Sequence, residues 1–249
     1  LLSSISELCS DFASEVEVEL FVHDNSCSKN VEYDYLQNLY TSFKCRYFYN
    51  GKNIGFGLGH NSNVGRVSST FDLVIIVNPD ISFNAIELMP LLRLMKNETN
   101  LSCVAPLVIN SYKEIQFSAK KNPTLLSLLL GRLSYLRKIS FFAKYYYSHR
   151  NEAYDYTSRT FEAQYLSGCF MAIPYLAFVN SGGFSQAYFL HLEDADITRR
   201  LAKLGRTLHF PESIVTHRWA RGSHRSIFQT FCLLKSIISY HKIWNIKFI

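Results

Sequence analysis

One apolar run constrains the fold more than any other part of the sequence. Residues 71–77 (FDLVIIV) form the most hydrophobic β-type segment, and this segment stops at Asn78-Pro79-Asp80. Because the run lacks regular polar alternation, we predict a central strand buried on both faces, as in parallel sheets flanked by helices. The chain is therefore expected to be an α/β protein.

Strands and helices alternate over much of the remaining chain. Helical patterns cover residues 1–13, 86–96 and 194–204, and further β-type runs cover residues 16–22, 45–49, 102–108, 168–173 and 207–210. This alternation predicts an open, doubly wound and mostly parallel sheet, in which ligands gather beyond the carboxyl ends of the strands. Asp24 and Asp80 follow two such strand ends.

Length and composition predict one main domain. At 249 residues and 48% hydrophobic content, the chain can bury one substantial core. We expect the main domain over residues 1–225, with a basic and aromatic insertion at about 115–150, followed by an apolar helical tail over residues 226–249. Six scattered cysteines without a C-x-x-C pair indicate reduced thiols in a cytosolic protein.

The formal net charge of +6 is compatible with three kinds of partner. Clustered Lys and Arg favour nucleic acid, an anionic membrane surface or a phosphate-bearing substrate. Because no nucleic-acid-binding motif is recognisable, we do not expect nucleic acid as the partner. No apolar run approaches the roughly 20 residues needed to cross a bilayer, so a soluble or peripheral protein is expected.

The first candidate site is Asn78-Pro79-Asp80 at the end of the hydrophobic strand. Carboxylate oxygen suits Mg²⁺ or Mn²⁺, and a diphosphate would supply further oxygen ligands. The alternative is that Asp80 caps the following turn or helix.

The second candidate is the acidic group Glu193-Asp194-Ala195-Asp196 at the start of a predicted helix. Helix-dipole capping explains one or two acids at such a position. The same dipole keeps a carboxylate ionised and able to accept a proton from a hydroxyl group. Both interpretations stay open at this point.

The third candidate is the segment from His217 to Arg225, which is basic and contains Gly222. Such a loop, with Arg221 in it, could fold over a diphosphate and offset its charge. The alternative is a structural histidine followed by solvated basic surface. The glycines Gly55, Gly57 and Gly59 match neither the P-loop nor the dinucleotide motif, and we expect them to allow close approach of the backbone.

Taken in order, these segments resemble glycosyltransferase family 2, and within it the rhamnosyltransferase-like branch that builds bacterial surface polysaccharides. The matching segments lie between about residues 16 and 225, and they are Val22-His23-Asp24-Asn25-Ser26, Asn53-Ile54-Gly55-Phe56-Gly57 with Asn61 and Gly65, Val77-Asn78-Pro79-Asp80, Gly168-Cys169-Phe170-Met171, Gly182-Gly183-Phe184, Glu193-Asp194-Ala195-Asp196 and His217.

The resemblance implies a GT-A fold and an inverting transfer from a nucleotide-sugar donor, with dTDP-rhamnose as the first expectation. Asp80 and His217 would hold Mg²⁺ or Mn²⁺, and Asp194 would act as the catalytic base. Glu193 and Asp196 would orient the acceptor. Donor binding is assigned to Asp24, which reads the nucleobase, together with Asn53, Gly55, Asn61, Asn78, Asp80 and Arg221.

The resemblance also implies a saccharide or polyprenyl-diphosphate-linked acceptor at the cytoplasmic face of the inner membrane. We expect peripheral membrane contact from residues 120–150, whereas residues 228–249 are expected to pack on the domain. Rival interpretations are a nucleotidyltransferase, whose glycine- and lysine-rich signature is not visible, and an inactive scaffold of the same fold.

Two departures from the family pattern stand out. The family's first strand would lie before Leu1, so we expect the numbering to begin inside the natural protein. Asn78 replaces the first acid of the stricter D-x-D motif, which leaves a metal-independent variant as an alternative.

Overall fold

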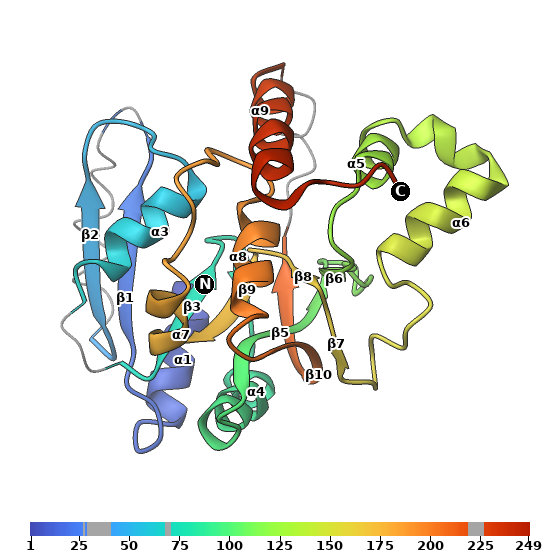
Figure 1. Ribbon diagram of the computed structural model, residues 1–249. Coiled ribbons are helices and arrows are strands. Elements are labelled where there is room, and N and C mark those ends of the chain that lie inside the picture. Colours follow the sequence, from blue (N-terminus) through green and yellow to red (C-terminus); the bar gives the residue numbers. More distant parts are fainter. Residues whose placement is uncertain (27, 29–40, 68–70, 219–226) are drawn as a thin grey trace.

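A computed structural model describes residues 1–26, 28, 41–67, 71–218 and 227–249. Its main sheet contains six strands. Five of them follow the order β3 (Leu73–Val77), β9 (Phe170–Pro174), β5 (Leu101–Ile109), β10 (Arg206–His217) and β4 (Ile81–Ser82), and β7 (Phe161–Glu162) also pairs with β10. Strand β10 runs parallel to β5, whereas β9 runs antiparallel to both β3 and β5. The strands lie side by side across the centre of the molecule (Figure 1).

The most buried strand is β5 rather than the expected β3. Every residue of β5 from Leu101 to Val108 is buried, whereas Ile76 is the one fully buried residue of β3. The expectation of a central strand at residues 71–77 was therefore wrong in its position. The physical reason is that β3 is the last strand of this sheet, and one of its edges faces a groove.

That groove separates β3 from a second, parallel pair of strands, β1 (Glu19–Asp24) and β2 (Lys44–Tyr49). It has a volume of about 360 Å³ and is lined by residues of both β1 and β3, with Leu1 also on its wall. The expectation of a strand before Leu1 stays a prediction.

Helices cover both faces of the main sheet (Figure 1). One face packs against α1 (Leu2–Asp11) and α4 (Ala85–Asn97) in a core that includes Leu8, Leu88 and Val104. The other face packs against α3 (Phe56–Val64), α7 (Tyr175–Asn180) and α8 (Glu193–Leu201). Helices on both faces are the layering that the sequence predicts for a doubly wound α/β fold.

The predicted insertion forms a helical lobe. It contains the short strand β6 (Ala119–Lys120), which pairs with β8 (Tyr165–Leu166), and then α5 (Leu125–Arg132), the 3-10 helix η1 (Ser134–Lys138) and α6 (Ser140–His149). The C-terminal helix α9 (Ile227–Trp244) packs its Tyr240 against Leu192 and Ala195 beside α8. The domain boundaries expected from the sequence stay a prediction.

Strand β10 is longer than the sequence predicts. It covers Arg206–His217 rather than residues 207–210. Its register against β5 shifts between Phe210 and Ile214, and the strand then continues because pairing with β5 resumes at Ile214. Such an irregularity hides the period of two that identifies a strand in the sequence. The longer strand carries His217 to the end of the sheet.

Candidate active site

Asp80 and His217 meet at the end of the main sheet, although 137 positions separate them in the chain. The His217 Nε2 atom lies 3.3 Å from Asp80 Oδ1 and 3.4 Å from Asn78 Nδ2. The Asp80 side chain is 40% exposed and that of His217 is 10% exposed. The arrangement therefore presents a carboxylate and an imidazole nitrogen side by side at the surface.

Gln116 fixes the orientation of this imidazole. Its Nε2 donates to the His217 carbonyl oxygen at 3.1 Å, so its Oε1 faces His217 Nδ1 at 2.9 Å. Nδ1 is therefore the protonated nitrogen of the neutral ring, and Nε2 keeps its lone pair on the side of Asp80. This second hydrogen bond is typical of a histidine prepared to bind a metal.

The donor set fits a divalent cation shared with a substrate. Within the described residues, no group of three His, Cys, Asp or Glu side chains converges to form a complete metal site. Mg²⁺ is commonly bound through one or two carboxylates together with substrate phosphates. Asp80 and His217 would therefore supply the protein's share of the ligands.

Asp24 lies at the end of β1, in the region expected to bind the donor. Its Oδ1 accepts from the Ser26 backbone N–H at 2.8 Å and from the Ser26 hydroxyl at 2.6 Å, and Tyr47 donates to its Oδ2. The next residue, Asn25, accepts from Ile54 N–H at 3.0 Å and donates to the Gly55 carbonyl at 3.2 Å. The end of β1 and the glycine-rich loop therefore form one unit.

Gly55 is required by the close approach of two backbones. Its φ is +91°, and a Cβ at this position would lie 2.4 Å from the Phe189 carbonyl oxygen. That oxygen accepts from Phe56 N–H at 3.2 Å, and Asn53 Oδ1 accepts from Gly55 N–H at 2.8 Å. Asn53 and Gly55 thus shape the loop, and their expected contact with a donor stays a prediction.

Asn61 ties helix α3 to the turn at Gly182-Gly183. Its Oδ1 accepts from Phe184 N–H at 2.8 Å, and its Nδ2 donates to the Phe184 carbonyl at 2.7 Å. Both ends of the amide are occupied by one backbone unit, so the geometry favours a positioning role for Asn61 over contact with a donor. Arg221, the remaining predicted donor residue, lies outside the described residues.

Asp194 stands in the first turn of α8, where three donors hold its carboxylate, one of them the Ala195 N–H at 3.0 Å from Oδ1. Its Oδ2 accepts from the Tyr165 hydroxyl at 3.0 Å and from Gly168 N–H at 3.1 Å. Burial, followed by the nearby charge of Asp194, raises the pKa of Tyr165 far above its usual value, so the phenol remains a donor. Burial lowers the pKa of the nearby Lys120, and the charge of Asp194 opposes that effect.

The backbone before α8 is strained. His191 and Leu192 have φ values of +73° and +66°, in the left-handed region that residues other than glycine rarely adopt. Such conformations cost on the order of 1–3 kcal/mol each and gather at functional sites. Here the sharp turn brings the three acids of α8 to the start of the helix.

Glu193 is 5% exposed, and its surroundings differ from those of Asp194. Its Oε2 has no hydrogen-bond partner among the described residues. Burial, together with the adjacent charge of Asp194, raises the pKa of the Glu193 carboxyl. Glu193 is therefore poorly suited to be an ionised catalytic base. Of the two neighbouring acids, Asp194 is the better candidate for that role.

Replacing Glu193 by Gln is expected to make the free energy of unfolding depend less on pH. A carboxyl whose pKa rises on folding binds its proton more tightly in the folded chain, so wild-type stability falls as pH rises above the unfolded-state pKa. The stability of Glu193→Gln relative to wild type should therefore increase between about pH 5 and pH 9. Urea unfolding across this range measures it, and two parallel stability curves would contradict the raised pKa.

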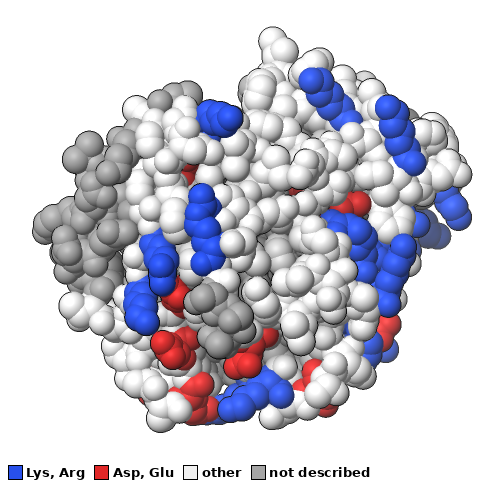
Figure 2. Space-filling model, turned by 60° about the vertical axis from the view of Figure 1, so that its left-hand side comes forward, with Lys and Arg blue, Asp and Glu red and all other residues white. Residues whose placement is uncertain are grey.

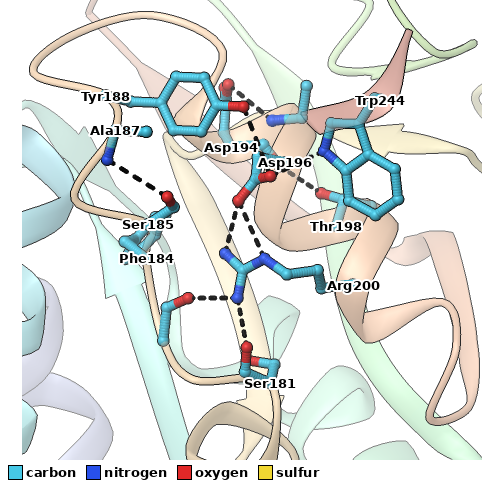
Figure 3. Close-up of polar contacts among 12 residues, drawn as sticks. Ser181, Phe184, Ser185, Ala187, Tyr188, Asp194, Asp196, Thr198, Arg200 and Trp244 are labelled. Atoms are coloured by element: carbon cyan, nitrogen blue, oxygen red, sulfur yellow. Dashed lines mark hydrogen bonds and ion pairs between the residues drawn. The ribbon is translucent and has the colours of Figure 1, made fainter. Parts of the chain in front are cut away.

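Asp196 lies inside the protein and binds three side chains (Figure 3). Its Oδ2 accepts from Arg200 Nη2 at 2.6 Å and Nε at 2.9 Å, and its Oδ1 accepts from Trp244 Nε1 at 2.8 Å and from the Tyr188 hydroxyl at 3.5 Å. At 1% exposure, this carboxylate cannot reach an acceptor from solvent. Its expected role in orienting the acceptor is not supported by this position.

Arg200 extends the network from α8 to the turn before it (Figure 3). Its Nη1 donates to the Gly183 carbonyl at 2.6 Å and also to the Ser181 carbonyl. Since Asn61 holds the adjacent Phe184, the same turn is fixed from two sides. The Asp196–Arg200 pair therefore connects α8, α9 and the glycine turn.

Solved structures of sugar-nucleotide enzymes have the same architecture. GalNAc-T7 with UDP, GalNAc and Mn²⁺ matches with a TM-score of 0.63 and 17% identity, over 91% of this chain and 42% of that chain. The mannosyltransferase PcManGT from Pyrobaculum calidifontis, in complex with GDP-Man and Mn²⁺, matches with a TM-score of 0.56 and 11% identity, over 90% of this chain and 54% of that chain. The chain therefore has the GT-A fold of glycosyltransferases, which confirms the fold expected from the sequence.

Two curated proteins are similar in sequence. The rhamnosyltransferase WbbL of Escherichia coli is 24% identical over 181 residues, which are 70% of this chain and 64% of that protein. The N-acetylglucosaminyl-diphospho-decaprenol L-rhamnosyltransferase of Mycobacterium tuberculosis is 25% identical over 185 residues, 70% of this chain and 59% of that protein. The chain thus spans about three fifths of the length of these relatives. No protein-family model matches the chain.

These similarities confirm the resemblance to rhamnosyltransferases that the ordered motifs indicated. They do not favour the rival interpretations, a nucleotidyltransferase or an inactive scaffold.

Proposed function

We propose that this chain is the donor-binding and catalytic part of an inverting glycosyltransferase that moves rhamnose from dTDP-rhamnose to a saccharide acceptor in surface-polysaccharide synthesis. One observation carries the proposal: two successive residues connect the Asp80–His217 group with Asp194. The Cys169 carbonyl accepts from Asn78 N–H at 3.0 Å, and Gly168 N–H donates to Asp194 at 3.1 Å. The candidate metal ligands and the candidate base are therefore fixed relative to each other.

In the proposed reaction, Asp194 accepts the proton of an acceptor hydroxyl. The hydroxyl oxygen forms a bond to the anomeric carbon while the bond from that carbon to the donor phosphate breaks on the opposite side, which inverts the configuration. The electron pair leaves with the nucleoside diphosphate. A divalent cation at Asp80 and His217 would offset the charge of that diphosphate. Tyr165 and Gly168 hold the Asp194 carboxylate in place for the proton transfer.

For the acceptor, we propose a sugar linked to a polyprenyl diphosphate at the cytoplasmic face of the inner membrane. Support comes from the Mycobacterium tuberculosis relative, whose name specifies a diphospho-decaprenol acceptor. None of the described helices has both the length and the hydropathy needed to cross a bilayer. A lipid-linked acceptor would therefore have to be met at the membrane surface.

Helix α9 offers a surface suited to that contact. Ile227, Phe231, Leu234 and Ile238 lie on one stripe of the helix, and each is more than half exposed. Residues 115–151 and 213–249 hold 13 of the 26 Lys and Arg residues and none of the 20 Asp and Glu residues. Figure 2 shows acidic side chains mainly in its lower half, away from the upper end where α9 lies in Figure 1. Residues 228–249 were expected to pack on the domain, and Tyr240 on the inner face of α9 does so. For the exposed stripe on the other face, we propose contact with anionic lipid.

The proposal predicts metal-dependent stabilisation by one nucleotide. A ligand that binds only the folded state raises the melting temperature by mass action, so dTDP with Mg²⁺ or Mn²⁺ should raise it, whereas each alone should do so much less. UDP and GDP test the nucleobase. Asp80→Asn should remove most of the shift, whereas Asp11→Asn, at the exposed end of α1, should preserve it. No shift with any of the three nucleotides would contradict the proposal.

A further inference from the structure

A pocket of about 390 Å³ lies where the helical lobe meets the C-terminal segment. Its walls come from the loop after β6, from α6, from α8 and from residues 244–249. The C-terminal wall is fixed, because Leu125 N–H donates to the Lys247 carbonyl at 3.0 Å and Leu126 N–H donates to the Phe248 carbonyl at 2.9 Å. Of the donor-site and metal-site residues predicted from the sequence, none that the structure describes lines this pocket.

Three cationic side chains line this pocket. These are Lys121, Arg199 and Lys247, and none of the Asp and Glu side chains in the described part of the chain lines it. Among the described residues, no carboxylate lies within 4.0 Å of any of these three cations. Burial lowers the pKa of His149, which also lines the pocket, to about 4, so this side chain is neutral at pH 7. An anionic ligand would offset the remaining positive charge.

Neutral groups in the same pocket suit a sugar beside the anion. Trp244 and Tyr145 present aromatic surface, and the Arg199 guanidinium lies 4.3 Å from the Trp244 ring centre. The buried Asn122 Oδ1 has no hydrogen-bond partner among the described residues. A ligand hydroxyl that reached this acceptor would satisfy it. The pocket thus combines cations, aromatic rings and a free acceptor.

The pocket and the proposed base share helix α8 and the segment that leads into β8. Arg199 follows Asp194 by five residues on α8, which corresponds to about 7.5 Å along the helix axis and a rotation of about 140° around it. Gln164 lines the pocket, and the next residue, Tyr165, donates to Asp194. An acceptor with its sugar at Asp194 would have to extend around this part of α8 to place a phosphate group in the pocket.

We propose that this pocket binds the phosphate or diphosphate of a glycosyl-phosphate acceptor, with the acceptor sugar next to Asp194. This inference rests on the proposed transferase function. Lys121 and Lys247 act as the phosphate ligands, and Trp244 packs against the sugar. The phosphate chemistry is shared by a glycosyl diphosphate and a phospholipid headgroup, and the experiment separates the two.

The test is calorimetric binding of inorganic pyrophosphate and of N-acetylglucosamine 1-phosphate to the full-length protein without divalent metal. The double variant Lys121→Ala/Lys247→Ala should weaken binding of both probes at least tenfold. The matched variant Lys235→Ala/Lys242→Ala removes the same charge from α9, outside the pocket, and should stay within about twofold of wild type. Equal weakening in both variants would show diffuse attraction to surface charge and overturn the pocket.

Two further measurements separate the possible failures. Sedimentation with phosphatidylglycerol vesicles tests the lipid source, because loss of vesicle binding in the pocket variant with unchanged pyrophosphate affinity would overturn the acceptor assignment. The stabilisation by dTDP and metal should be the same in both variants. If it persists while pyrophosphate fails to bind, the pocket inference falls and the transferase proposal stands.

Discussion

Replacing Asp194 by Asn is expected to lower turnover about 100-fold or more, because general-base catalysis typically contributes factors of this size. The amide keeps the shape of the carboxylate but cannot accept the proton of the acceptor hydroxyl. Since the proposed role of Asp194 concerns the acceptor hydroxyl, donor binding should remain, with an unchanged dTDP-dependent melting shift. Initial rates of transfer at saturating donor and acceptor measure the effect.

The control for this variant is Glu193→Gln, which changes the neighbouring acid in the same way. Burial already favours the protonated form of Glu193, so its replacement by an uncharged isostere should lower turnover far less. Full activity in Asp194→Asn would remove this residue from the mechanism. Loss of activity in Glu193→Gln with an active Asp194→Asn would transfer the role of base to Glu193.

Replacing Asp196 by Ala is expected to reduce the free energy of unfolding by about 3–5 kcal/mol, the cost of removing one partner from a buried ion pair. The variant leaves Arg200 without its carboxylate, and it leaves the Trp244 indole N–H without an acceptor. Urea denaturation should show a lower midpoint with a similar slope, as expected for lost stability within the same fold.

The exposed pair of Glu162 and Arg206 provides the matched control. The two side chains are 65% and 48% exposed and lie 2.8 Å apart, so Glu162→Ala should cost about 0–1 kcal/mol. If Asp196→Ala lowered the free energy of unfolding as little as Glu162→Ala does, the structural role of Asp196 would be contradicted. Asp196 would then again be a candidate for contact with the acceptor.

The sequence predicted the strand ends well because the signals there are local. An apolar run followed by a polar cluster identifies both the strand and its end, so Asp24 and Asp80 could be placed without a structure. The order of strands in the sheet carries no local signal, and this is why β5 rather than β3 proved to be the most buried strand.

The contacts that adjust the site could not be predicted in this way. Gln116 lies 101 positions from His217, and Asn61 lies 123 positions from Phe184. No spacing rule connects residues so far apart, because their contact depends on how strands and loops are arranged in three dimensions. Tyr165 was missed for the same reason, since β8 approaches α8 only in the folded chain.

Asp196 is a case in which the sequence did hold a usable signal. Residues two apart on a helix do not face each other, so Asp194 and Asp196 cannot both point to one acceptor. Arg200 follows Asp196 by four residues, the spacing of an intrahelical ion pair. This spacing indicates a paired and inward-facing Asp196, as the structure has it.

The most direct test of the proposed function is transfer by the full-length protein from dTDP-rhamnose, with Mg²⁺ or Mn²⁺, to a polyprenyl-diphospho-N-acetylglucosamine acceptor. Mass spectrometry of the product, with release of dTDP measured in parallel, reports whether the glycosidic bond forms. We expect a product heavier by one deoxyhexose residue, with the anomeric configuration inverted relative to the donor. Release of dTDP without that product, or no turnover with this donor or any UDP- or GDP-sugar, would contradict the account.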